Sequence, residues 1–386
     1  MKPTRIDQVV PSFAGRDAIG IHILHVRELL RDLGFASDIY CGGVQEEVRD
    51  QALLMDEIGN RPADGRWLIF HHSNGSPVAE EFLGRPEPKL LDYHNITPAG
   101  LVDTWAPWVR EELELGRDQL RRLSSACFYA MADSAFNEVE LIDNGCRVTR
   151  VVAPLFDLAA FETKVDEEVL ARLLDARSSG GADWLFVGRV APHKAQHDLI
   201  KAFACYKRYF DPLARLHLVG TWMGEDYPRA LRRFADRIGL GDAVQITGLV
   251  SDGALAAYYR AADVLVCASD HEGFCVPLVE AMHLGLPVVT YGSTAIPDTV
   301  GAGAVVVEDK TPMALATAAH QVVTDRRLHD RLVDMGRRRA QYFSLGESRA
   351  RMAAAIQEAL EVADSIVIDD SFADTDRRSA GSLASG

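Results

Sequence analysis

Long hydrophobic runs are missing from this chain of 386 residues. No stretch approaches the roughly 20 apolar residues that a membrane-spanning helix needs. The first residues, MKPTRIDQVVPSF, also lack the long apolar segment of a secretory leader. We therefore expect a cytoplasmic protein. Peripheral contact with the inner face of a membrane stays open, because such contact requires no apolar run.

Cysteine is scarce and follows no ligand spacing. The six cysteines are Cys41, Cys127, Cys146, Cys205, Cys267 and Cys275, and no two form a C-x-x-C pair. Several lie in apolar runs, as Cys267 does after Val264, Leu265 and Val266. This pattern favours buried free thiols in a reducing compartment over a disulfide framework or a zinc site.

Basic residues are outnumbered by acidic ones. The chain has 41 Lys and Arg against 56 Asp and Glu, for a net charge of −15. A nucleic-acid partner is therefore not expected, since such proteins usually present a basic surface. A phosphate site in an acidic protein has to be built from specific residues. Single Arg and Lys side chains in loops after strands become informative for that reason.

Several catalytic signatures are absent. The sequence contains no G-x-G-x-x-G, no G-K-[ST], no G-x-S-x-G and no H-E-x-x-H. The adjacent His71 and His72 end an expected strand, where neighbours point to opposite faces, so they should not chelate one metal together. These absences disfavour dehydrogenases, kinases, ATPases, serine hydrolases and zinc peptidases.

The alternation of short apolar runs with helical patterns is typical of parallel α/β sheets. In the first half, expected strands are 6–11, 38–41, 67–71, 89–93, 128–132 and 150–153. In the second half, they are 184–190, 216–220, 244–247, 264–268, 287–291 and 304–307. The predicted fold is two doubly wound α/β domains in tandem, with ligands at the carboxyl ends of the strands.

Composition suggests the limits of the domains. We predict an N-terminal domain over 1–165, a linker over 166–182 and a second domain over 183–335. Helices over 336–364 should return to the first domain. The Ser-, Asp- and Gly-rich segment 365–386 is expected to be a disordered tail.

The first informative motif is the run from Phe186 to Lys194, in which a strand passes through a short loop into a helix. Gly188 would allow the backbone to turn close to a ligand. Arg189 and Lys194 would then project from the strand end and the loop, where two cations can hold a diphosphate. A pair of solvated surface cations is the alternative interpretation.

The second motif runs from Asp270 to Met282 and also follows an apolar strand. Gly273 and Phe274 form its loop, and Pro277 suits the first turn of a helix. Free N–H groups at a helix start can face phosphate oxygens. Glu272 and Glu280 are carboxylates that could accept sugar hydroxyl protons. They could equally be ordinary helix and loop charges.

The two motifs V-G-R-x-x-x-x-K and E-G-F-x-x-P-x-x-E-A together resemble the donor site of glycosyltransferase family 4. The resemblance implies a GT-B fold, with two Rossmann-like domains facing an interdomain cleft, and a retaining transferase that needs no metal cofactor. By the same resemblance, Arg189 and Lys194 bind the diphosphate, Glu272 the donor sugar and Glu280 the ribose. Backbone groups of Phe274, Cys275, Val276 and Leu278 would meet phosphate and sugar, and Val250 would line the base.

The N-terminal half offers two further matches to this family. A loop from Pro11 to Gly20 carries Gly15, Asp17 and Gly20 where the family places a glycine loop near the phosphates and acceptor. It departs from the usual double glycine. His94 follows the strand 89–93 and matches the family histidine that faces the donor sugar.

The resulting expectation is a mannosyltransferase-like enzyme that moves a hexose from GDP- or UDP-hexose to a hydroxyl group. The acceptor would be a glycan or a lipid-linked glycan in cell-surface polysaccharide synthesis. The alternatives are a sugar phosphorylase or sugar-nucleotide epimerase of the same architecture, and a nucleotide-sugar-binding protein without catalysis.

Overall fold

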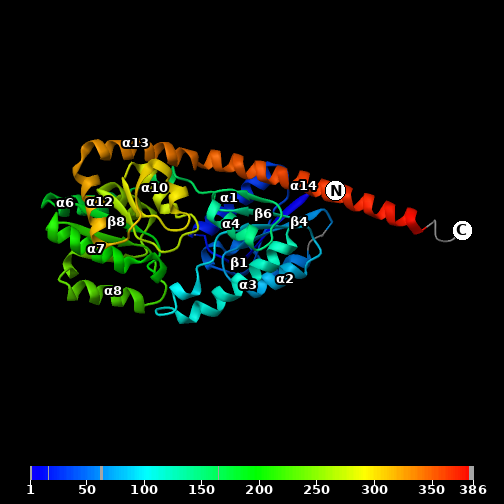
Figure 1. Ribbon diagram of the computed structural model, residues 1–386, viewed down its shortest axis with the longest axis horizontal. Helices are drawn as coiled ribbons and strands as arrows, with labels where there is room; N and C mark the ends of the chain where they lie inside the picture. The colour runs from blue at the N-terminus through cyan, green and yellow to red at the C-terminus, as the bar shows by residue number, and fades with distance from the viewer. Residues whose placement is uncertain (1, 16, 61–63, 164, 382–386) are drawn as a thin grey trace.

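A computed structural model describes residues 2–15, 17–60, 64–163 and 165–381. They form two α/β domains, each built on a wholly parallel sheet (Figure 1). The first sheet has the order β3-β2-β1-β4-β5-β6-β7 and the second β10-β9-β8-β11-β12-β13. The second order is that of a Rossmann sheet. The predicted fold class is therefore confirmed.

The N-terminal domain places its most apolar segments in the centre of the sheet. Every residue of β4 and β5 is buried, as expected for strands covered on both faces by helices. The strands are β1 (Arg5–Phe13), β2 (Ile39–Val44), β3 (Leu53–Leu54), β4 (Arg66–His72), β5 (Lys89–Tyr93), β6 (Tyr129–Ala132) and β7 (Thr149–Val151). The α-helices are α1 (Ala18–Asp32), α2 (Pro77–Gly84), α3 (Arg110–Ala126) and α4 (Ala135–Asp143).

The second domain repeats the plan around a separate core. Its strands are β8 (Asp183–Val187), β9 (Arg215–Val219), β10 (Val244–Gly248), β11 (Val264–Cys267), β12 (Val288–Tyr291) and β13 (Ala304–Val307). Its helices are α5 (Ala160–Thr163), α6 (Glu167–Ser178), α7 (Gln196–Tyr209), α8 (Asp226–Arg237), α9 (Asp252–Ala261), α10 (Val276–Leu284), α11 (Ile296–Val300), α12 (Pro312–Thr324) and α13 (Arg326–Tyr342).

Most of the predicted linker 166–182 is the helix α6, which belongs to the second domain. This helix packs against α9, and Leu173 is buried in the core of the second domain. Phe156 and Leu158 already belong to that core. The second domain thus begins well before the predicted residue 183, since apolar residues at helical spacing in this charged segment bury against α9.

The long helix α14 (Leu345–Gly381) crosses back to the N-terminal domain, as Figure 1 shows. Met352, Ile356 and Ala359 are buried in a core cluster that also holds Ile6 and Val26. The predicted return over 336–364 is thus seen for α14, but residues 336–342 end α13, which packs against α10 of the second domain. The expectation of a disordered tail from residue 365 requires correction, because the helical backbone continues to Gly381. Residues 382–386 lie outside the described part.

Strand order brings loops of the two domains face to face. In each sheet, successive strands are added first on one side of the first strand and then on the other. The switch point therefore lies between β1 and β4 in the first sheet and between β8 and β11 in the second. Ligands of doubly wound sheets bind in the crevice at such switch points. A contact between Trp105 and Tyr227, with ring centroids 5.6 Å apart, joins the domains beside this crevice. Among the described residues, no helix is long and apolar enough to cross a membrane.

Candidate active site

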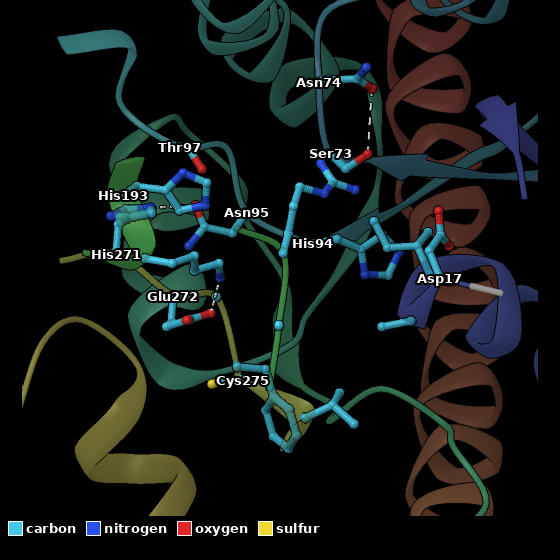
Figure 2. A pocket seen from close by; sticks show the side chains of 18 of the residues that line it. Asp17, Ser73, Asn74, His94, Asn95, Thr97, His193, His271, Glu272 and Cys275 are labelled. Carbon is cyan, nitrogen blue, oxygen red and sulfur yellow. Dashed lines mark hydrogen bonds and ion pairs between the residues drawn. The ribbon is translucent and has the colours of Figure 1, made fainter. Parts of the chain in front are cut away.

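A cavity of about 620 Å³ lies between the domains and has the size of a small-molecule site. Loops after β1, β4, β5 and β6 line it from the N-terminal domain, and loops after β8 and β11 line it from the second. Figure 2 shows Glu272, His193 and His271 on one side, with Asp17 and His94 on the other. Ten of the predicted site residues line it: Asp17, His94, Gly188, Arg189, Lys194, Glu272, Gly273, Phe274, Cys275 and Val276.

The loop after β8 presents the two predicted cations. Gly188 has φ 147°, a backbone conformation that side chains rarely adopt. Arg189 is exposed, and its guanidinium has no hydrogen bond or ion pair with any described residue. Lys194 instead forms an ion pair with Glu272, at 2.5 Å between Nζ and Oε2. Burial opposes the charge of Lys194, but the Glu272 carboxylate outweighs it and raises the pKa of the lysine.

The loop after β11 holds Glu272 in place and starts α10 beside the cavity. The Glu272 N–H donates to Thr294 Oγ1 at 2.9 Å, and the Thr294 hydroxyl donates back to the Glu272 carbonyl at 2.8 Å. Cys275 precedes the helix with φ 73°, a left-handed conformation that costs a non-glycine residue about 1–2 kcal/mol. The helix then begins at Val276 with Pro277 in its first turn, as predicted.

Five predicted residues do not line the cavity: Gly15, Gly20, Val250, Leu278 and Glu280. Leu278 is fully buried, and its N–H donates to the Cys275 carbonyl at 3.1 Å. That N–H is therefore unavailable to a phosphate. Val250 lies in the loop after β10, beyond the described lining.

Glu280 lies one turn into α10 and accepts a hydrogen bond from the Tyr259 hydroxyl at 2.5 Å. Burial raises the pKa of this carboxyl to about 7, although the Tyr259 bond acts in the opposite direction. The lining ends at Pro277, three residues earlier. Glu280 can reach only a ligand that extends from the cavity along the first turn of α10.

The two glycines of the first loop shape its backbone. A Cβ on Gly20 would lie 1.6 Å from the Ala14 carbonyl oxygen, and one on Gly15 would lie 2.4 Å from Val48 Cγ1. The Gly20 N–H donates to Asp17 Oδ1 at 2.6 Å, so Asp17 caps α1. These glycines let the loop fold back and present Asp17 to the cavity.

His94 lines the cavity but has both ring nitrogens occupied. Its Nδ1 lies 3.1 Å from each carboxylate oxygen of Asp133, and its Nε2 lies 3.0 Å from His71 Nδ1. The expected contact between this histidine and the donor sugar can therefore not use a free ring N–H in this arrangement.

Asn95 is a lining residue that the sequence did not reveal. It has φ 76°, and its Oδ1 accepts a hydrogen bond from His271 Nε2 at 2.9 Å across the cleft. This bond leaves the buried Nδ2 without a partner among the described residues. A strained residue with an unpaired donor beside a cavity indicates a ligand contact. The Asn-Ile-Thr-Pro turn was the only sequence signal for it.

Two groups of side chains bring possible metal-binding atoms within 4.8 Å of one another. One comprises His22, His71, Asp92 and His94, and the other Cys267, Glu272 and Cys275. In the second group Glu272 is already paired with Lys194.

Comparison with known proteins identifies relatives of both halves. A family model described as "Glycosyl transferases group 1" matches residues 176–339. A D-inositol 3-phosphate glycosyltransferase of Geodermatophilus obscurus is 33% identical over 325 residues, covering 80% of this chain and 70% of that protein. A GDP-mannose-dependent alpha-(1-6)-phosphatidylinositol monomannoside mannosyltransferase of Mycobacterium tuberculosis is 32% identical over 159 residues, covering 39% and 40%.

Solved structures share the arrangement of both domains. Anabaena HepE in complex with UDP and glucose superposes with a TM-score of 0.72 at 18% identity, covering 92% of this chain and 100% of that one. At this identity the likeness concerns the fold alone.

Proposed function

This chain belongs to the group 1 glycosyl transferases, and we propose that it moves a hexose from a nucleoside-diphosphate sugar to an acceptor hydroxyl. Arg189 and Lys194 would bind the diphosphate, Glu272 the hexose, and Glu280 the ribose hydroxyls. His94 would act from the opposite wall of the cavity.

This proposal rests on two cationic side chains that line the same cavity. Arg189 is free to bind an anion, and Lys194 can exchange its carboxylate partner for one. The Arg189 guanidinium has no hydrogen bond or ion pair with any described residue, Lys194 is ion-paired with Glu272, and α10 begins beside them. A diphosphate leaving group gains negative charge in the transition state, and fixed cations and a helix N-terminus stabilise it. We propose on this basis that transfer needs no metal ion.

The finer features of the reaction follow from relatives and from the family resemblance. One relative is named for GDP-mannose and one solved structure contains UDP and glucose, so the proposed donor is GDP- or UDP-hexose, with mannose first. We propose a retaining reaction in which the acceptor hydroxyl attacks the face that the diphosphate leaves. The proposed acceptor is a glycan or lipid-linked glycan of cell-surface polysaccharide synthesis, with peripheral contact at the inner membrane face.

The test is a transfer assay with a panel of nucleotide sugars and acceptors. The acceptors include lipid-linked glycans, a free oligosaccharide, and inositol 3-phosphate because of the relative's name. Acceptor-dependent release of nucleoside diphosphate, in the presence of a chelator, is the expected result, with Lys194→Ala as control. Sugar transfer to inorganic phosphate would indicate a phosphorylase instead, and tight donor binding without turnover would indicate a binding protein.

A further inference from the structure

At the N-terminal wall of the cavity, a buried cluster links His94 to residues of four separate segments. His22 comes from α1, His71 from β4, Asp92 from β5, and Asp133 follows β6. The first three and His94 are close enough to surround a metal ion. They are also close enough to form a hydrogen-bonded chain. The positions of the ring protons distinguish the two arrangements.

The tautomer of His22 is fixed by a backbone donor. The Leu155 N–H donates to His22 Nδ1 at 2.9 Å, so Nδ1 carries a lone pair. The neutral ring must then bear its proton on Nε2, which donates to Asp92 Oδ2 at 2.8 Å. A protonated Nε2 is no metal ligand, because metals bind the lone pair of a neutral imidazole. This bond disfavours a metal ion in the cluster.

The tautomer of His71 is fixed in the same way through Gln8. The Gln8 amide Nε2 donates to the Ile23 carbonyl at 3.1 Å, and a carbonyl can only accept, so the orientation of the amide is settled. Gln8 Oε1 therefore faces His71 Nε2, at 2.9 Å, and accepts its proton. His71 Nδ1 is left with a lone pair directed at His94. Burial lowers the pKa of His71 well below its ordinary range and keeps the ring neutral.

His94 then stands between two acceptors. The His71 Nδ1 lone pair lies 3.0 Å from His94 Nε2, and the Asp133 carboxylate lies 3.1 Å from Nδ1 through both oxygens. A ring that donates from both nitrogens is an imidazolium.

We propose that His94 is a charged imidazolium at neutral pH, held doubly protonated by the Gln8–His71 chain on one side and by Asp133 on the other, and that it acts on the donor site through its charge. Gln8, His71 and Asp133 are thus positioning residues. The role in transfer rests on the proposed function, whereas the protonation state does not.

The charges around His94 favour this state. Asp133 and Asp92 contact or approach the ring, and Asp17 at the start of α1 adds a third carboxylate. Among the described residues, the rings of His22, His71 and His72 also interact with it. Burial opposes the positive charge, but Asp133 and Asp92 outweigh burial and raise the pKa of His94 to about 9. Burial also raises the pKa of Asp133, whereas the charge of His94 and its hydrogen bond act in the opposite direction.

A fixed charge at this place has a clear use. Both N–H groups of His94 are committed, so the ring neither gives nor takes a proton during transfer. Its charge acts on Asp17, which Arg189 influences from across the cleft. An anionic leaving group in the cavity would therefore meet the cations of the second domain, while the His94 imidazolium offsets one of the carboxylates on the opposite wall.

The test is the protonation state of His94 measured by ¹⁵N NMR of the full chain across about pH 5.5–8.5, the range in which an ordinary histidine titrates. We expect both ring nitrogens to remain predominantly protonated up to about pH 8, with deprotonation beginning only above that, with and without UDP or GDP. This readout is independent of transferase activity, so a failed activity assay and a failed protonation model can be distinguished.

Variants of Asp133 and His71 should lower the pKa of His94 into the pH range of the NMR titration. Asp133→Asn removes the counter-charge, and His71→Leu removes the acceptor for Nε2. In both, His94 should titrate within that window, and kcat/KM should gain a new limb that falls by about tenfold per pH unit above the new pKa. His71→Asn can present an oxygen acceptor to His94 and should restore the charged ring.

His72→Leu is the matched control. His72 is a buried histidine on the same strand, and its Nε2 donates to the Gly116 carbonyl at 2.9 Å on the other face of the sheet. Its loss should lower stability without changing the titration of His94. A bare Nδ1 in the unaltered protein would place the proton on Asp133 and overturn the proposal. An equimolar bound metal, lost on His22→Ala, would overturn it as well.

Discussion

Replacing Lys194 tests the donor site most informatively, because the structure predicts two separable effects. Lys194→Ala removes a diphosphate ligand, and we expect kcat/KM to fall by at least about tenfold, equivalent to about 1.4 kcal/mol of transition-state stabilisation. It also strands Glu272, whose side chain is 7% exposed. Removing one partner of a buried ion pair usually costs about 3–5 kcal/mol of folding free energy. Because the Lys194 side chain is 19% exposed, we expect the lower value, about 3 kcal/mol.

The two effects are separated by a double variant and a matched lysine. Lys194→Ala with Glu272→Gln should recover most of the lost stability, measured by denaturant unfolding, without recovering donor affinity. Lys310 is also 19% exposed and ion-paired, to Asp198 at 3.0 Å, but it does not line the cavity. Lys310→Ala should lose comparable stability and keep most of its activity. Equal losses of kcat/KM in both single variants, measured well below their melting temperatures, would refute the assignment of Lys194.

Further predictions concern the remaining parts of the cavity. Glu280→Ala should raise the dissociation constant for the donor in calorimetry. Because burial raises the pKa of Glu280 to about 7 and ribose hydroxyls favour its carboxylate, donor affinity should weaken below that pH by up to about tenfold per pH unit. Asn95→Gly keeps the left-handed backbone but deletes both the unpaired amide and the oxygen that accepts from His271, so kcat/KM should fall and stability should drop by about 1–3 kcal/mol, the cost of the unpaired His271. Gly20→Ala should destabilise the fold, because its Cβ would meet the Ala14 carbonyl at 1.6 Å. For His94, the pKa is raised from 6.5 to about 9 in the folded protein. The resulting stabilisation is complete below pH 6.5 and is lost as the pH rises through 9. The free energy of unfolding should therefore drop by about 3 kcal/mol between pH 6.5 and pH 9.

The strands and the donor loops were predictable because their signals are local. A buried parallel strand is a short apolar run, and the residues after it reach the cavity by topology alone, as Arg189 and Glu272 do. Gly188 and Pro277 were visible for the same reason, since each has a backbone role that few other residues can fill.

The histidine cluster could not be predicted from the sequence because it is assembled from distant segments. His22, His71 and Asp92 lie on separate elements, and only strand order and register bring them together, with His71 opposite Asp92 in neighbouring strands. The observation that His71 and His72 point to opposite faces was sound, but it said nothing about partners of His71 from elsewhere. The packing of α6 against α9 could not be predicted, because its charged exposed face and Ser/Gly-rich end resemble a helical linker and only Leu173 is fully buried in the second core.

The central claim is that the cations of the second domain hold the donor diphosphate across the cleft. A crystal structure with a nucleoside diphosphate tests it most directly. We predict that the β-phosphate lies within hydrogen-bonding distance of Arg189 and Lys194, beside the start of α10. The ion pair between Lys194 and Glu272 should be broken in that complex. A nucleotide bound elsewhere, with the Lys194–Glu272 pair intact, would contradict the account.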